Sequence, residues 1–123
     1  MAEILLAEDD ESFRTFLAKA LTRAGHSVVQ CGDGEEALTW VESRGADFDL
    51  LLADIVMPGV DGIELARRAA ELIPGLRVLF ITGFAAVALH AQRSSPASAE
   101  ARVLSKPFYL NELVDQIDNM LAA

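Results

Sequence analysis

Cysteine, basic residues and long hydrophobic runs are all scarce in this sequence, and each scarcity excludes a class of protein. The single cysteine, Cys31, cannot form an internal disulfide, so nothing in the chain requires an oxidising compartment. Only 10 lysines and arginines stand against 19 aspartates and glutamates, and this net charge of -9 argues against binding to nucleic-acid phosphates. The glycine patterns GxGxxG and GxxxxGK[ST], which bind nucleotide phosphates, are also absent.

No segment of the sequence has the length or flanks of a membrane anchor or a secretion signal. The longest apolar-rich run covers residues 78–91, which is shorter than the roughly 20 residues that a membrane-spanning helix needs. The N-terminus has no basic stretch followed by an apolar one. We therefore expect a cytoplasmic protein.

The chain has the length and apolar content of one compact domain. Its 123 residues are close to the commonest domain size, and 52% of them are hydrophobic, which is enough for a core. We expect residues 1–123 to form a single domain, with no room for an attached output domain.

Short apolar runs alternate with longer segments of helical period, which is typical of an α/β fold with a parallel sheet covered by helices on both faces. Five strands are predicted, at residues 4–7, 28–31, 50–54, 78–82 and 102–105. Helices are predicted at residues 11–24, 33–43, 62–72 and 110–121. Residues 84–101 begin with an alanine-rich helical stretch and continue with serine and proline, so we expect a short helix and then a mobile loop.

Several polar residues are predicted to serve the fold. Asp10 and Asp61 each precede a predicted helix. At this position an aspartate caps the first turn, and the helix dipole stabilises its negative charge. His26 and His90 lie far from the acids and are expected to be partly exposed structural residues. Cys31 lies in an apolar strand, so an unreactive buried thiol is expected.

Charged and hydroxyl side chains follow four of the five predicted strands. Glu8 and Asp9 come after the first strand, and Asp54, Thr82 and Lys106 end or follow the third, fourth and fifth. Because the carboxyl ends of parallel strands meet at one edge of the sheet, these side chains should converge there. Two like charges about 4 Å apart repel by roughly 4 kcal/mol at an effective dielectric of 20, so the three acids need a cation.

The chemistry of this set favours phosphoryl transfer. Glu8, Asp9 and Asp54 supply hard oxygen ligands that suit Mg²⁺ better than Ca²⁺. A cation, the ammonium of Lys106 and the hydroxyl of Thr82 would stabilise the oxygens of a phosphoryl group in transfer. Asp54 would then be the nucleophile and become an aspartyl phosphate.

Five motifs in order along the whole chain resemble those of response-regulator receiver domains. They are Glu8-Asp9, residues 54–59 (DIVMPG), Asp61-Gly62, Thr82-Gly83 and residues 105–108 (SKPF). The resemblance implies a flavodoxin-like, CheY-like doubly wound fold with strand order 2-1-3-4-5. It also implies a two-component signalling protein rather than an enzyme acting on a separate substrate.

The resemblance assigns a role to each residue of the cluster. In the family, the aspartate in the place of Asp54 accepts phosphate from a phosphohistidine. The acids in the places of Glu8 and Asp9 bind Mg²⁺, together with the backbone carbonyl of the residue in the place of Val56. The lysine-proline bond that corresponds to residues 106–107 is often cis. The donor is a histidine kinase or histidine phosphotransferase, which we expect to dock on the first helix around Phe13, Phe16 and Ala20.

The resemblance extends to a subgroup of single-domain receivers of alphaproteobacteria that act as adaptors for the ClpXP protease. It rests on residues 5–10, 54–58, 62–68, 80–89 and 103–108. This implies ClpX as a partner, and the apolar end, residues 121–123, is either a fraying helix end or a tail that ClpX recognises. One departure is Val103, because receivers commonly carry an aromatic residue there that moves together with the threonine.

Three other functions stay open from the residues. A flavodoxin-like electron carrier shares the topology, although its phosphate-binding loop after the first strand would be acidic here. A phosphatase of the haloacid dehalogenase type also uses an aspartate nucleophile, but places it after the first strand. The chain could also be a receiver-like interaction module that phosphorylation does not control.

Overall fold

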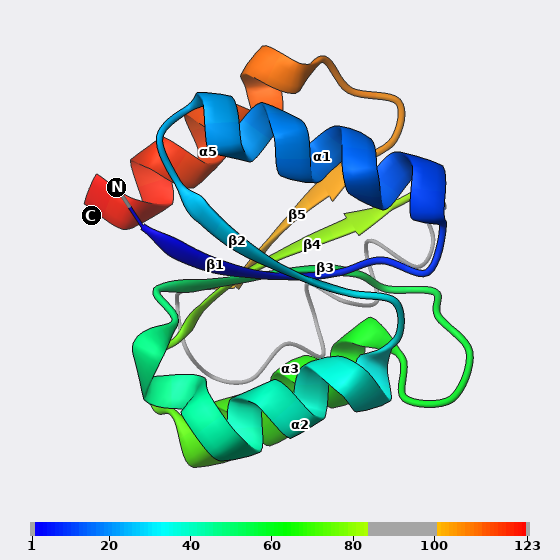
Figure 1. Cartoon of the computed structure of the whole chain (residues 1–123), viewed down its shortest axis with the longest axis vertical. Coiled ribbons are helices and arrows are strands. Elements are labelled where there is room, and N and C mark those ends of the chain that lie inside the picture. The colour runs from blue at the N-terminus through cyan, green and yellow to red at the C-terminus, as the bar shows by residue number, and fades with distance from the viewer. Residues whose placement is uncertain (1, 84–100, 123) are drawn as a thin grey trace.

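The protein folds as a parallel five-stranded sheet between two layers of helices (Figure 1). The computed structural model describes residues 2–83 and 101–122. The strands are β1 (Glu3–Ala7), β2 (Ser27–Cys31), β3 (Leu50–Asp54), β4 (Arg77–Thr82) and β5 (Ala101–Ser105). Their order, β2-β1-β3-β4-β5, confirms the predicted doubly wound fold.

Four α-helices are described, and they confirm the predicted ones to within a residue or two. They are α1 (Glu11–Arg23), α2 (Gly34–Arg44), α3 (Gly62–Leu72) and α5 (Leu110–Ala122). A short 3-10 helix, η1 (Gly45–Asp47), follows α2 and was not predicted. The predicted short helix and loop fall on residues 84–100, outside the described residues. Within the described ranges, no helix has both the length and the apolar content needed to cross a bilayer.

The central strand β3 shows why the strands of this sheet have continuous apolar sequences. All five of its residues are buried. Leu50 and Leu52 pack in the core cluster formed with α1 and α5, whereas Leu51 and Ala53 pack with α2 and α3 on the other face. Figure 1 shows these helix pairs on opposite faces of the sheet. Helices cover both faces of such a strand, so neither face meets solvent. Its sequence therefore lacks the alternation of apolar and polar residues that a half-exposed strand shows.

Three aspartates fix where the helices begin. Asp10, Asp33 and Asp61 precede α1, α2 and α3, and each carboxylate accepts a hydrogen bond from the backbone N–H three residues further on, at 2.8–3.1 Å. This satisfies one of the N–H groups that a helix start leaves without an internal partner. The predicted capping roles of Asp10 and Asp61 are confirmed.

The prediction that His26 is partly exposed is wrong. Its Nδ1 accepts a hydrogen bond from the backbone N–H of Ala2 at 3.1 Å, and its Nε2 lies 3.2 Å from Oδ1 of Asp118. These contacts leave His26 only 8% exposed and assign the proton to Nε2, which donates to the carboxylate. His26 therefore ties the start of β1 to α5, while His90 lies outside the described residues.

Cys31 is completely buried at the end of β2, as predicted. Burial, with smaller contributions from Glu36 and Asp33, raises the pKa of its thiol to about 12. The group stays neutral and behaves as a small apolar side chain.

Candidate functional site

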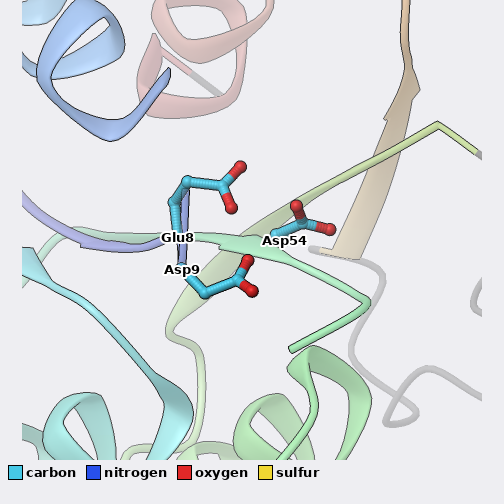
Figure 2. A group of neighbouring side chains, drawn as sticks. All are labelled: Glu8, Asp9 and Asp54. Atoms are coloured by element: carbon cyan, nitrogen blue, oxygen red, sulfur yellow. The ribbon is translucent and has the colours of Figure 1, made fainter. Parts of the chain in front are cut away.

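Three carboxylates converge at the carboxyl end of the sheet. Glu8 and Asp9 directly follow β1, and Asp54 is the last residue of β3, the neighbouring strand. One oxygen from each lies within 4.8 Å of the others. Figure 2 shows the three side chains facing a common space beyond the ends of these strands. The chain adds β2 on one side of β1, and β3, β4 and β5 on the other, so the strand order reverses between β1 and β3. Open α/β sheets form their binding sites at such a topological switch point.

The three acids differ in burial, and this sets their electrostatics. Glu8 is completely buried and Asp54 is 7% exposed, whereas Asp9 is exposed. Burial, reinforced by the adjacent Asp54, raises the pKa of Glu8 from 4.5 to about 8. The charged form of Glu8 is therefore costly unless a positive charge lies close to it.

Lys106 provides one positive charge at this cluster. Its Nζ lies 3.3 Å from Oδ2 of Asp54 and 3.5 Å from Oε1 of Glu8. It follows β5 at the same edge of the sheet, and its bond to Pro107 is cis, as the family resemblance implied. Lys106 therefore forms an ion pair with the acidic cluster.

Backbone contacts hold the two buried carboxylates in place. Oδ1 of Asp54 accepts a hydrogen bond from the N–H of Val56 at 3.1 Å, and Oε2 of Glu8 accepts one from the N–H of Asp10 at 3.2 Å. Arg14 donates from Nη1 to the backbone carbonyl of Glu8 at 2.9 Å. Sequence periodicity placed Arg14 on α1 but gave no sign of this contact.

The loop from Asp54 to α3 is anchored at a glycine. The N–H of Gly62 donates to the carbonyl of Ile55 at 2.9 Å. A Cβ at position 62 would lie 2.3 Å from the carbonyl oxygen of Asp54, so the start of α3 can approach the end of β3 only without a side chain. The loop that carries Val56 is therefore fixed at both ends.

Thr82 is completely buried at the end of β4. It lies one residue beyond Ile81, the register partner of Asp54, and its carbonyl accepts a 2.6 Å hydrogen bond from the N–H of Lys106. The structure therefore places Thr82 at the same edge as the acids. Val103, which replaces the aromatic residue common in the family, is partly buried beside Phe80 in the register of β4 and β5.

The donor set fits a small divalent cation. Oε1 of Glu8 is buried, and among the described residues it has no hydrogen-bond partner; its nearest described positive charge is the ammonium of Lys106. A small divalent cation held by Glu8, Asp9 and Asp54 would stabilise a buried carboxylate oxygen in this state. Hard carboxylate oxygens suit Mg²⁺, which keeps several waters when two or three carboxylates hold it.

Comparisons with known proteins agree with this geometry. Residues 4–118 match the family model described as response regulator receiver domain. Over 123 residues, the chain is 53% identical to "Response regulator receiver protein CpdR" of Brucella abortus strain 2308, covering 100% of this chain and 99% of that protein. It is also 35% identical over 120 residues to the sensor kinase CckA of the same organism, spanning 98% of this chain but 12% of that kinase.

Solved structures give the same result at the level of the fold. A response regulator receiver protein from Sinorhizobium medicae superposes with a TM-score of 0.89 at 30% identity, covering 99% of this chain and 95% of that one. The receiver domain of the hybrid histidine kinase CckA gives 0.82 at 30% identity, covering 97% and 98%. These matches favour the receiver interpretation over a flavin-binding carrier or a haloacid dehalogenase-type phosphatase.

Proposed function

Because the chain belongs to the response regulator receiver domain family, we propose that it is a phosphorylatable signalling module of a two-component phosphorelay. One observation supports this most directly: the carboxylates of Glu8, Asp9 and Asp54 converge within 4.8 Å, with an ammonium beside them. A carboxylate surrounded by positive charge can receive a phosphoryl group without prohibitive repulsion.

Asp54 is the proposed phosphoryl acceptor. One of its carboxylate oxygens attacks the phosphorus of a phosphohistidine, the P–N bond breaks, and the electron pair leaves with the imidazole. The product is an acyl phosphate on Asp54, and attack by water on its phosphorus later releases inorganic phosphate. The chain thus promotes its own phosphorylation and dephosphorylation and acts on no separate substrate.

Four groups of the chain are proposed to hold Mg²⁺: the carboxylates of Glu8, Asp9 and Asp54, and the backbone carbonyl of Val56. When bound there, Mg²⁺ would supply positive charge that offsets the negative oxygens of the incoming phosphoryl group. The buried Glu8 oxygen and the anchored loop after Asp54 support this assignment.

Lys106 and Thr82 are proposed to bind the transferred group. The ammonium of Lys106, 3.3 Å from Asp54, needs only a short movement to pair with a phosphoryl oxygen on that residue. Thr82 lies at the end of β4, and its hydroxyl would donate a hydrogen bond to another oxygen of the phosphoryl group. Both interactions strengthen as charge develops on the phosphoryl oxygens, which is how such groups accelerate transfer.

The phosphodonor is proposed to be a histidine kinase or histidine phosphotransferase that docks on α1. Phe16 is 52% exposed on this helix, and a cavity of about 280 Å³ lies between it and the start of α5. The similarity to CckA concerns a receiver domain, since the solved CckA domain superposes on this chain. It therefore supports a phosphorelay context and does not by itself identify CckA as the donor.

The proposed output is binding to a protein partner, and ClpX of the ClpXP protease is the proposed candidate. The support is 53% identity to CpdR over nearly the full length of both proteins, together with the adaptor role of the subgroup that the sequence resembles. On this proposal, residues 1–123 act in the cytoplasm as a receiver domain.

Intact-mass measurement after incubation with acetyl phosphate and Mg²⁺ tests the central step. We expect one added phosphoryl group on the wild-type protein and none on Asp54→Asn. Asp61→Asn is the matched control, because Asp61 is another loop aspartate but only caps α3. An adduct that persists in Asp54→Asn would refute the acceptor assignment.

Absence of an adduct with acetyl phosphate and with a phosphorylated histidine phosphotransferase would instead support the alternative, an interaction module that phosphorylation does not control. Binding of purified ClpX, measured with phosphorylated and unphosphorylated protein, then tests the output. Equal or absent binding in both states would refute the proposed adaptor role.

A further inference from the structure

The ammonium of Lys106 contacts an aromatic ring as well as two carboxylates. Its Nζ lies 4.4 Å from the centroid of the Phe13 ring, within the range of a cation–π interaction. Phe13 belongs to α1 and Lys106 follows β5, so the contact joins two elements that are far apart in the sequence. The ammonium is therefore in contact range of this ring and of the oxygens of Glu8 and Asp54 at the same time.

The Phe13 ring is itself held in place. The backbone N–H of Phe13 donates to Oδ1 of Asp10 at 3.1 Å. This hydrogen bond fixes the first turn of α1 beside the loop that carries Glu8. The ring of Phe108 packs against it at a centroid distance of 6.3 Å and an interplanar angle of 57°. Phe108 lies two residues after Lys106, so its packing against Phe13 also holds the Phe13 ring close to the backbone of Lys106.

A lysine at this position needs such a constraint. Its side chain is 31% exposed, and its stem has four rotatable carbons, so many conformations would carry the ammonium into solvent. Attraction to Glu8 and Asp54 has little directional preference. The aromatic face of Phe13 removes part of this freedom, because the ammonium is also favoured over the ring.

We propose that Phe13 is a positioning residue that keeps the ammonium of Lys106 next to Asp54. It does not touch the reacting atoms, and its effect on phosphoryl transfer passes through Lys106. The inference rests on the proposed function for its kinetic consequence, but the contact can be tested without any phosphorylation.

The substitutions follow from the surroundings of Phe13. Phe13 is partly exposed and lines the cavity of about 280 Å³ together with Phe16, so leucine at position 13 keeps an apolar side chain without emptying the core. Phe13→Leu removes the ring face, and Phe13→Tyr retains it. Phe16→Leu is the matched control, because Phe16 is 52% exposed in the same cavity, whereas the ring recorded over the ammonium is that of Phe13.

The contact is tested by NMR with lysine-selective ¹³C labelling. The chain has two lysines, Lys19 and Lys106, so Lys19 on the exposed side of α1 serves as an internal reference. A ring face shifts the ε-methylene protons of Lys106 upfield. We expect this shift in wild type, Phe13→Tyr and Phe16→Leu, and its loss in Phe13→Leu with Lys19 unchanged. A wild-type Lys106 signal at the random-coil position would overturn the proposal.

The kinetic consequence is measured with acetyl phosphate and Mg²⁺, a donor too small to use the helix as a docking surface. Phe13→Leu should slow phosphorylation of Asp54 roughly threefold, the size expected from losing a partly exposed cation–π contact. Phe13→Tyr should restore the rate, because it keeps the ring face beside the ammonium. If Phe13→Leu loses the upfield shift but keeps the rate, the positioning role is refuted. If the wild type takes up no phosphoryl group, the proposed function fails instead, while the NMR result still decides the contact.

Discussion

Two buried ionisable side chains lie at opposite ends of the sheet and have opposite surroundings. At the amino end, both ring nitrogens of His26 have partners, the N–H of Ala2 and the carboxylate of Asp118. At the carboxyl end, Glu8 is completely buried, and its Oε1 has no hydrogen-bond partner among the described residues. Carboxylate oxygens of Asp9 and Asp54 lie within 4.8 Å of a Glu8 oxygen, and the Lys106 ammonium lies 3.5 Å from Oε1.

The difference distinguishes a structural polar residue from a binding residue. A buried polar group with all its partners stabilises the fold, whereas a buried like-charge cluster costs stability until a ligand supplies the missing charge. His26 should therefore matter for folding and Glu8 for binding. The following predictions test this contrast, beginning with the largest effect.

The largest effect is expected on Mg²⁺ affinity at the carboxyl end. Glu8→Gln removes a charged ligand and should weaken Mg²⁺ binding roughly 10- to 100-fold by isothermal titration calorimetry. Asp10→Asn is the control: Asp10 belongs to the same acidic run but caps α1, and asparagine caps equally well. Equal losses in both variants would mean that only general charge is being measured.

The next effect concerns stability at the amino end. His26→Ala should lower the free energy of unfolding by about 1–3 kcal/mol, because it leaves the N–H of Ala2 buried without its acceptor and opens a small void. Urea denaturation measures this. Asp118→Asn should cost less than about 1 kcal/mol, since that side chain is 56% exposed and its amide oxygen can still accept from Nε2. A His26→Ala variant as stable as wild type would remove the contrast.

Glu8 should make the metal-free protein less stable as the pH rises. Its pKa is about 8 in the folded state and near 4.5 in the unfolded state, so between these values the folded state binds the extra proton. Stability must then fall with rising pH across this window, and saturating Mg²⁺ should oppose the loss. Thermal unfolding of Glu8→Gln should show a flatter pH dependence, and an unchanged profile would contradict the prediction.

The smallest expected signal is proton release on metal binding. Because burial and the adjacent Asp54 raise the pKa of Glu8 to about 8, protonated Glu8 is favoured at pH 7 in the metal-free protein, and Mg²⁺ should displace up to about one proton. Calorimetry in two buffers of different ionisation enthalpy measures that number. Glu8→Gln should release fewer protons than wild type, and equal release would assign the proton to another group.

The sequence predicted the elements well, and its errors have physical causes. Four of the five strands begin one residue earlier than predicted. At Glu3, Ser27 and Arg77 the reason is that backbone pairing in the sheet begins before the first apolar side chain of the strand. The helix η1 was missed because a segment of three residues is too short to show a helical repeat of apolar residues. The burial of His26 was missed because its partner Asp118 lies 92 residues away.

The convergence of the site could be anticipated, but its detailed contacts could not. Placing acids and a lysine after parallel strands predicted that Glu8, Asp54 and Lys106 would meet. No periodicity indicates that Arg14 bonds the carbonyl of Glu8, or that Phe13 lies under the ammonium. Such contacts depend on helix rotation and side-chain conformation, which packing decides.

By itself, the sequence determined the alternation of strands and helices, the aspartates that begin the helices, and which strand ends carry charge, because these follow from local periodicity and capping. Only the tertiary structure decided which of those charges meet. Asp54 and Lys106 are 52 residues apart, and their 3.3 Å contact exists because hydrogen-bonded registers join β3, β4 and β5 into one sheet. The burial that raises the pKa of Glu8 likewise comes from segments far apart in the chain, since a local sequence cannot exclude water from its own carboxylate.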